Sequence, residues 1–298
     1  MTESQTITDS RPRTAVPAQE GNQWASHVLA GVAGQTSALA EGSLRAWWNH
    51  SVALSGRQIL VAVRDVYTLI QVLIVPAVSM VMFKVVLGDV IGEALGYDSI
   101  YGTVPMVILI GAMFGSIAAA TRLNSERLTG LLARLYVLPI NRGAELTSRV
   151  VAELVRIVVT TLILLVVGYI LGFRFTQGAG PAVGLVVVAL AYGAAFSLVA
   201  FAFAVNAAPG APIVPLLGLL SSLMMFFNAG FSPVAAYPTW LQPIVANQPM
   251  TPAIEVMRAC AIGGPVADSL IKTALWTVGI GALAIYPALR GYRKAAVG

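Results

Sequence analysis

The apolar residues of this chain fall into six blocks, each bounded by turn residues or charges. A helix of about 20 apolar residues crosses the roughly 30 Å hydrocarbon layer of a bilayer, and each block approaches that length. The fifth block opens with Pro212 and Pro215, which a membrane helix tolerates when neighbours satisfy the freed carbonyls. The pattern predicts transmembrane helices over residues 67–87, 104–121, 150–171, 183–205, 212–231 and 270–289.

A shorter amphipathic helix is predicted over 46–66, ahead of the first block. Its apolar residues repeat at helical spacing from Ile59, and Trp47 and Trp48 are suited to anchor it in the membrane interface. The alternative is a soluble helical extension. Residues 1–45 are rich in Ser, Thr, Gln, Pro and Gly, and we expect a disordered cytoplasmic tail there, without a cleaved signal peptide.

Composition supports an integral membrane protein. Hydrophobic residues make up 57% of the 298, only 10% are charged, and the mean hydropathy is +0.81. Soluble domains carry about 25% charged residues. A soluble enzyme is therefore excluded, and a disulfide-stapled fold is excluded because Cys260 is the sole cysteine.

The basic residues indicate topology. The 88–103 loop has acidic residues and no Lys or Arg, whereas the 122–149 loop holds five arginines and the C-terminal end is basic. All but four of the 18 basic residues then lie inside; the four on the outer side are Lys84, Arg174, Arg258 and Lys272. This places both termini in the cytoplasm of a multi-pass plasma (inner) membrane protein and requires an even number of spans. No basic run interleaved with aromatics is present, so we expect no nucleic-acid partner.

The inner loop, 122–149, is patterned rather than a plain connector. Its leucines lie on one helical face until Pro139 stops the helix: Leu128, Leu131, Leu132, Leu135 and Leu138. Such a helix either lies against the membrane as an interfacial hairpin or inserts into a groove on a partner. The residues alone leave both possibilities open.

The outer segment, 232–269, is apolar but broken by six prolines, so it cannot form one span. Thr251 is placed to cap a short helix here, with Pro252 at its first position, and Glu255 and Arg258 are three residues apart, close enough for an ion pair on one helical face.

The inner loop contains a characteristic set of residues: Ser125-Glu126-Arg127, Gly130, Leu131-Leu132, Leu138-Pro139-Ile140 and Arg142. With this set the chain resembles a known family, the ABC-2 type exporter permeases. Within that family it is most similar to the daunorubicin/doxorubicin-resistance (Drr) permeases, particularly the subunit that pairs with a second, different permease. Further similar residues are Arg64-Asp65, Pro76, Tyr237-Pro238-Thr239-Trp240-Leu241-Gln242-Pro243, Asn247-Gln248-Pro249-Met250-Thr251-Pro252 and Glu255 to Arg258. The resemblance covers about residues 57–294 and departs at Val66, where many relatives have proline.

The resemblance implies an all-α integral membrane protein with an interfacial elbow helix and six transmembrane helices, the transmembrane domain of a type V ABC exporter. The inner loop would dock on a separate ATPase subunit through these coupling residues: Glu126, Arg127, Gly130, Leu131, Leu132, Arg134, Leu138, Pro139 and Arg64. The outer segment 232–269 would form small helices that dip back into the membrane and close the outer mouth of the pathway, or else a lid without a gating role. The outer gate would comprise Trp240, Glu255 and Arg258. A second permease, a copy or a homologue, completes the transporter.

The chain itself is not expected to be an enzyme. It has no GxxxxGK[ST] phosphate loop, so ATP and Mg would be bound by the partner ATPase and no cofactor by this chain. Its histidines precede the spans and no catalytic or metal-binding motif occurs, which disfavours a membrane hydrolase or acyltransferase. A channel would not need the patterned loops.

The substrate is expected to be a large hydrophobic or amphipathic molecule, either a complex cell-wall lipid or a polyketide-like drug. The candidate path residues combine thioether, aromatic and polar groups, though helix packing would use the same types: Ser222, Met225, Phe227 and Asn228. The ionisable residues Lys84, Glu153, Arg156 and Lys272 are assigned to span ends, leaving no charge inside the spans. The alternatives are a permease for a polysaccharide or glycolipid and a gradient-driven membrane transporter.

Overall fold

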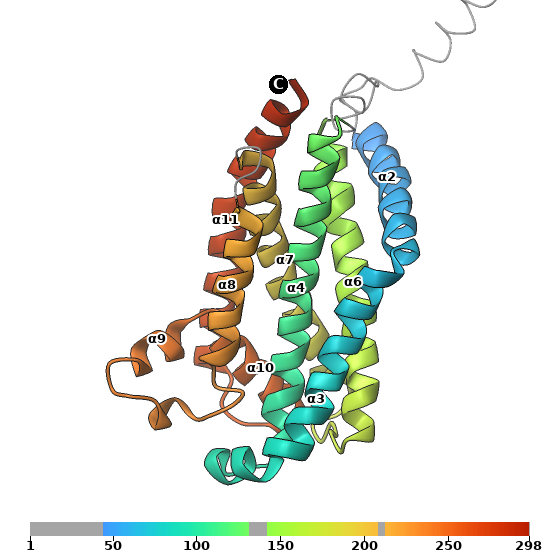
Figure 1. The fold of residues 1–298 in the computed structure, drawn as a ribbon. Coiled ribbons are helices and arrows are strands. Elements are labelled where there is room, and N and C mark those ends of the chain that lie inside the picture. Colours follow the sequence, from blue (N-terminus) through green and yellow to red (C-terminus); the bar gives the residue numbers. More distant parts are fainter. Residues whose placement is uncertain (1–43, 131–141, 208–211, 298) are drawn as a thin grey trace, which may run out of the picture.

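The computed structural model describes residues 44–130, 142–207 and 212–297, and in this part of the chain it is helical without strands (Figure 1). The long helices run along one common direction, and the short ones gather at one end. The helices are α2 (Leu44–Arg64), α3 (Val66–Leu95), α4 (Ile100–Leu128), α6 (Arg142–Ile170), α7 (Ala179–Asn206), α8 (Ile213–Phe226), the 3-10 turn η1 (Val234–Ala236), α9 (Gln242–Asn247), α10 (Met250–Ile262) and α11 (Ala267–Val297).

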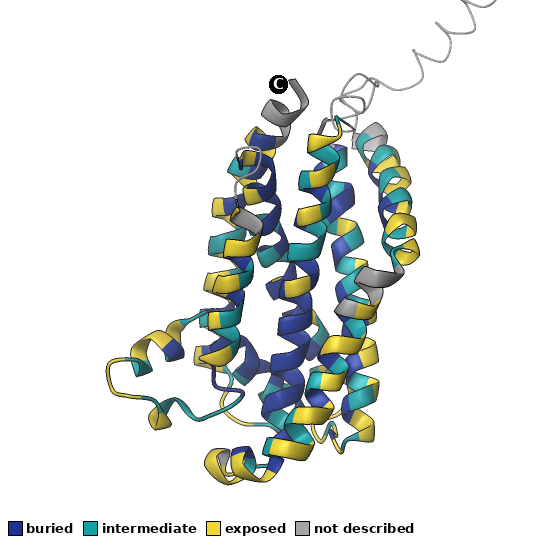
Figure 2. Ribbon diagram, in the orientation of Figure 1, coloured by how far each residue is buried: buried dark blue, intermediate teal, exposed yellow. Residues whose placement is uncertain are grey.

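Helix α4 lies at the centre of the bundle. Of its most apolar window 78% is buried, against 22% for α3 and 11% for α11 (Figure 2). Its residues 106–110 are all buried, and they form one core with side chains of α6, α7 and α10. The outer faces of α3, α6 and α11 instead expose large aliphatic side chains, which is the pattern of helices facing lipid.

Five described helices are long and apolar enough to cross a membrane: 72–94, 100–128, 144–170, 179–206 and 267–291. The predicted fifth span, 212–231, is different. Its helix α8 has 14 residues, about 21 Å at 1.5 Å per residue, which is short of a roughly 30 Å hydrocarbon layer. The helix ends at Phe226 because the chain turns at Asn228, whose side chain bonds the backbone around it. Five of the six predicted spans thus correspond to helices of membrane-crossing length, and the count of six is not confirmed.

The predicted inner loop is shorter than 122–149. Helix α4 continues to Leu128 and α6 begins at Arg142, so most of the predicted loop extends these two helices. Gly130, with φ of +73°, ends the α4 side in the left-handed region that favours glycine. Of the leucine stripe, Leu128 is exposed on the last turn of α4, and Leu131, Leu132, Leu135 and Leu138 lie outside the described residues.

The predicted elbow helix corresponds to α2, within two residues of its expected bounds at each end. It bends into α3 at Asp65 and runs alongside α6 rather than across the ends of the spans (Figure 1). One contact between the two helices is the bond from the Ser55 hydroxyl to the Ser148 carbonyl, 3.4 Å. The helix is thus part of the bundle wall.

The outer segment forms η1, α9 and α10, as its prolines predict. Helix α10 is buried against α4, α7 and α11, and Met250, Ala253, Ile254 and Met257 have no exposed surface. Thr251 is not the cap of this helix, because α10 begins one residue earlier at Met250. Its hydroxyl accepts a bond from the Ala229 N–H instead, 3.3 Å.

Candidate functional site

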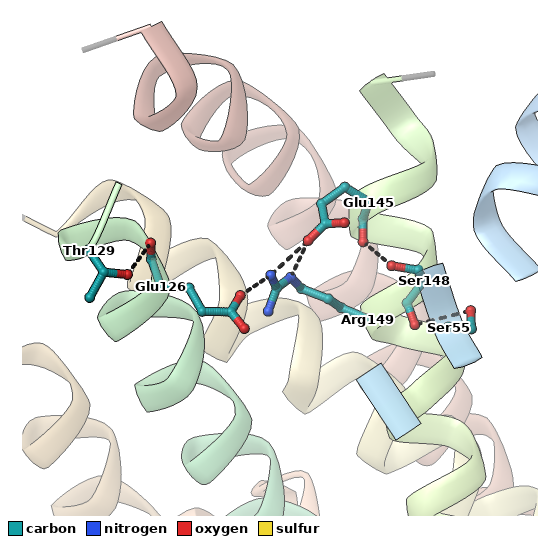
Figure 3. Close-up of polar contacts among 6 residues, drawn as sticks. All are labelled: Ser55, Glu126, Thr129, Glu145, Ser148 and Arg149. Atoms are coloured by element: carbon teal, nitrogen blue, oxygen red, sulfur yellow. Dashed lines mark hydrogen bonds and ion pairs between the residues drawn. The ribbon is translucent and has the colours of Figure 1, made fainter. Parts of the chain in front are cut away.

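A buried charge cluster joins the last turn of α4 to the first turns of α6 (Figure 3). The Arg149 guanidinium donates to the carboxylate of Glu145, one turn away on α6 at 2.7 Å, and to that of Glu126 on the last turn of α4. Only 5% of the Arg149 side chain is exposed, and the two glutamates are mostly buried. We call Glu126, Glu145 and Arg149 the α4–α6 clamp.

Hydroxyl groups extend the clamp into the backbone around it. The Ser148 hydroxyl donates to the Glu145 carbonyl at 2.7 Å, and the Thr129 hydroxyl donates to the Glu126 carbonyl at 3.1 Å (Figure 3). The Ser148 carbonyl in turn accepts from Ser55 of α2. Three helices therefore meet at the clamp.

Two further arginines connect this end of the bundle. Arg127 donates to the Ala207 carbonyl at 2.6 Å, a cation at the C-terminal end of α7 where the helix dipole favours it. Arg122 pairs with Asp65 at the α2–α3 bend, 3.7 Å. Helices α2, α3, α4 and α7 are thus connected near the described end of α4.

The clamp is a structural link between two helices. The described residues contain no group of three or more His, Cys, Asp or Glu side chains that could hold a metal ion. The clamp carboxylates are bound by an arginine rather than poised as acid and base. A buried, hydrogen-bonded ion pair holds two helices in one relative position because separation would strand its charges.

The predicted coupling residues are only partly placed by the structure. Glu126 lies in the clamp, Arg127 bonds the end of α7, Gly130 follows α4, and Arg64 is exposed at the end of α2. Leu131, Leu132, Arg134, Leu138 and Pro139 lie outside the described residues. The sequence reading missed Arg149 and Glu145, although their i, i+4 spacing is an ordinary signal for a helical ion pair.

Two residues of the predicted outer gate have other hydrogen-bond partners than expected. Glu255 and Arg258 do not form the expected ion pair, because each has a partner on another element: Glu255 accepts from Ser269 at 2.6 Å, and Arg258 donates to the Tyr97 hydroxyl at 2.7 Å. Trp240 is 71% exposed and shares no hydrogen bond with either within the described residues. Arg258 thus fastens α10 to the α3–α4 turn.

The neighbouring Asp98 belongs to the same turn. Partial burial alone would raise the pKa of this carboxyl, but bonds from the Ile100 N–H at 3.0 Å and the Lys84 ammonium at 2.6 Å more than offset it. Its pKa therefore lies below the ordinary value. Lys84, which was expected at a span end, lies near the middle of the 72–94 span, and its ammonium reaches Asp98 in this turn.

Replacing Tyr97 by Phe is expected to lower the free energy of unfolding by about 1 kcal/mol, because one hydrogen bond is lost while the ring under Arg258 stays. The measurement is the denaturation midpoint in detergent. Tyr286→Phe, at a 67% exposed position, is the control and should show no change. Equal midpoints for the two variants would mean that the Arg258 bond does not hold the turn.

The predicted path residues lie at the end of α8. The Ser222 hydroxyl donates to the Gly218 carbonyl within its own helix, and Phe227 is partly exposed. Asn228 is completely buried, and its amide bonds the carbonyls of Met224 and Met225 and the Gly230 N–H. The structure gives Asn228 a role in shaping the turn; a contact of Ser222, Met225, Phe227 or Asn228 with a substrate stays a prediction.

One expectation about charges is wrong. Glu153 and Arg156 were assigned to a span end, but α6 begins at Arg142 rather than 150, so Arg156 lies midway along the 144–170 span. It pairs with Glu153 at 2.6 Å and donates to the Ala112 carbonyl of α4 at 3.2 Å. The spans therefore contain an ion pair, which is neutral as a unit.

Comparison with known proteins decides the family. The ABC-2 type transporter model matches residues 50–262, more than half of the chain. This chain belongs to the ABC-2 type transporter family. The family consists of multi-pass membrane subunits without their own ATPase domain, which agrees with the helical bundle described above.

Relatives of this ABC-2 permease carry drug-resistance names. It is 38% identical over 232 residues to "Probable doxorubicin resistance ABC transporter permease protein DrrC" of Mycobacterium tuberculosis, covering 78% of this chain and 84% of the relative. "Doxorubicin resistance ABC transporter permease protein DrrB" of the same species is 32% identical, covering 53% of this chain and 54% of the relative. "Daunorubicin resistance ABC transporter permease protein DrrB1" of Streptomyces coeruleorubidus is 24% identical, covering 71% and 72%.

Proposed function

We propose that this chain is the permease subunit of an ATP-driven exporter that moves a large hydrophobic or amphipathic molecule out across the plasma membrane. The observation that carries the proposal is the α4–α6 clamp, which ties the end of the central helix α4 to the start of α6, the two helices that the 131–141 segment connects in the sequence. A partner that binds this segment would pull on both helices together. The ATPase, with its ATP and Mg, would be that partner.

The clamp supports a mechanism of coupling by rigid-body movement. A nucleotide-dependent change in an ATPase can reposition a permease only through a stiff element joined to the spans. Glu126 and Arg149 make the α4 and α6 ends such an element, and Arg127 extends it to α7. The movement would reach the centre of the bundle because α4 is its most buried long helix.

The names of the relatives support an amphipathic substrate. Doxorubicin and daunorubicin are the drugs in those names, and a complex cell-wall lipid has the same combination of a large apolar body and polar groups. Glu153 and Arg156, near the middle of the 144–170 span, neutralise each other, and Lys84, near the middle of the 72–94 span, pairs with Asp98. A highly charged substrate is disfavoured by that arrangement.

A second permease would complete the transporter. The chain matches relatives called DrrC and DrrB, both from Mycobacterium tuberculosis, over different shares of its length. Two distinct permeases in one species favour pairing with a homologue over pairing with a copy.

Replacing Leu132 by Asp is expected to reduce ATPase association at least tenfold, because a charge would be placed on the apolar docking stripe; tenfold corresponds to about 1.4 kcal/mol. Leu132→Met is the control, since it keeps the position apolar. The measurement is the amount of ATPase that co-purifies with the tagged chain in mild detergent. Undiminished ATPase with Leu132→Asp would reject the docking role of the inner loop.

The exporter assignment itself is tested by purifying the tagged chain from its native host and identifying its partners by mass spectrometry. An ATPase subunit in about equal amount is expected. A chain that is recovered alone at native expression would overturn the proposal and favour a gradient-driven transporter.

A further inference from the structure

A cavity of about 200 Å³ lies in the bundle wall between α2, α3, α4 and α6, apart from the α8 residues predicted for the substrate path. Its lining is mainly aliphatic. The polar groups are confined to a few side chains from α2, α4 and α6. The residues that matter for its chemistry are Gln58, Val63, Gly115, Glu153, Arg156 and Val159.

Gln58 supplies an unused hydrogen-bond donor to this wall. Its side chain is buried, with 6% exposed, and its Nε2 has no hydrogen-bond partner within the described part of the chain. A buried amide N–H without an acceptor loses its hydration and gains nothing in return. An acceptor oxygen of a bound molecule in the adjoining cavity would satisfy it.

Gly115 shapes the opposite wall of the cavity. A Cβ at this position would lie 1.9 Å from Nη1 and 2.1 Å from Cζ of Arg156, so the guanidinium occupies the space that a side chain on α4 would need. There it bonds the carbonyls of Gly111 and Ala112 and the Glu153 carboxylate. The polar groups of this wall are therefore fixed in place by the absence of one Cβ.

The cavity has an apolar rim that faces outward. Val63 of α2 and Val155 and Val159 of α6 are 58%, 41% and 47% exposed, and they line the cavity as well as the outer surface of the bundle. An exposed aliphatic surface on a membrane protein faces lipid. A molecule dissolved in the bilayer would enter here sideways with its apolar body.

The charges around the cavity disfavour an anionic head group. Each of the lining arginines already has a carboxylate partner: Arg122 pairs with Asp65, Arg149 with Glu126 and Glu145, and Arg156 with Glu153. These three arginines face four carboxylates, so the local sum is not positive. The group still missing is an uncharged hydrogen-bond acceptor for Gln58, such as the oxygen of a carbonyl, ester or hydroxyl.

We propose that the α2–α3–α4–α6 cavity binds an amphiphile with an apolar body and an uncharged, oxygen-bearing head, taken laterally from the inner leaflet. Gln58 donates to the head, Arg156 and Glu153 form the polar wall, and the valine rim holds the apolar body. This rests on the proposed function in one respect: the bound amphiphile is the molecule class that the exporter moves.

The probe is a diacylglycerol carrying a diazirine in one acyl chain, with a phosphatidic acid of identical chains as its anionic twin. The full chain, with any partner subunits that co-purify, is placed in phosphatidylcholine nanodiscs and irradiated, and labelled peptides are mapped by mass spectrometry. We expect labelling of the peptides around 58–73 and 149–160, at least about fivefold stronger for diacylglycerol. Equal labelling by both probes would overturn the uncharged-head assignment, and labelling elsewhere would overturn the site.

Gly115→Ala is the decisive variant, because the new methyl must displace the Arg156 guanidinium into the cavity. Gly111→Ala is its matched control: the same change on the same helix, where the added Cβ meets only ordinary contacts at 3.6 Å and beyond. Diacylglycerol labelling should fall about tenfold in the first and stay within twofold in the second. Equal labelling in both variants would reject the cavity as the binding site.

Val159→Trp provides a second test, should Gly115→Ala fold poorly. It blocks the rim from a position already 47% exposed and should also abolish labelling. ATPase co-purification is recorded for every variant. If the unsubstituted chain retains its ATPase but is not labelled at the cavity, this site alone is refuted, whereas an unsubstituted chain recovered without any ATPase refutes the exporter assignment.

Discussion

Replacing Arg149 by Met is expected to lower the free energy of unfolding by about 3 to 5 kcal/mol, the usual consequence of removing one partner from a buried ion pair. The variant leaves Glu126 and Glu145, both mostly buried, as two uncompensated carboxylates at the junction of α4 and α6. Because this junction is the proposed coupling element, ATPase-driven transport should also be lost. The measurements are the denaturation midpoint of the purified chain and substrate export in cells.

A triple variant separates charge from shape. Arg149→Met combined with Glu126→Gln and Glu145→Gln removes every charge of the clamp, and neutral replacement of a whole buried ionic group often restores stability. Most of the loss in the midpoint should be recovered. Transport should recover less than stability, because the strong link between α4 and α6 is gone. An Arg149→Met chain as stable as the wild type would show that the clamp does not hold the helices together.

Replacing Asn228 by Leu has the second-largest expected effect, a destabilisation of about 3 kcal/mol. The completely buried amide satisfies the Met224 and Met225 carbonyls and the Gly230 N–H. Each buried polar group left unpaired costs about 1 to 3 kcal/mol, and Leu has a similar size but no polar atom. The turn after α8 would lose its internal support.

Asn247→Leu is the matched control, since its exposed amide bonds the Pro243 carbonyl and water can replace that bond. The two midpoints are compared in the same detergent. The expected order is a large decrease for Asn228→Leu and a change below about 1 kcal/mol for Asn247→Leu. Similar midpoints would mean that Asn228 does not stabilise the turn, and its predicted place in the substrate path would then be the reading to test.

Much of the helical bundle could be predicted from the sequence, because long apolar segments identify membrane helices directly. Five predicted spans correspond to long helices, and α2 lies where the amphipathic helix over 46–66 was expected. The prolines of the outer segment correctly excluded a single long helix there. These features depend on local composition, so no knowledge of tertiary contacts was needed.

The errors have tertiary causes. Hydropathy put the start of the third span at 150, but α6 begins at Arg142, and Glu145 and Arg149 of its first turns are paired with each other. The same shift moved Arg156 from a span end to its middle, where Gly115 makes room for it. Glu255 and Arg258 have the spacing for an ion pair on α10, but their side chains bond Ser269 and Tyr97 instead.

The pairing of Glu126 with Arg149 could not be predicted from spacing, since the residues are 23 positions apart and lie on different helices. Helical periodicity reports partners within one turn or two, such as Glu145 and Arg149. The orphaned amide of Gln58 is also invisible in sequence, because a glutamine on an amphipathic helix is usually solvated. Both findings required the three-dimensional arrangement.

The fit of the Arg156 guanidinium over Gly115 has a mechanical consequence when taken together with the clamp. Two helices that are joined at a single point can rotate about it, whereas two helices joined at two points can neither rotate nor slide past each other. Helices α4 and α6 are joined at their inner ends by Arg149 and near their middles by Arg156. A movement imposed where α4 ends and α6 begins would therefore displace both helices together. Any relative movement would occur at their contacts with other helices.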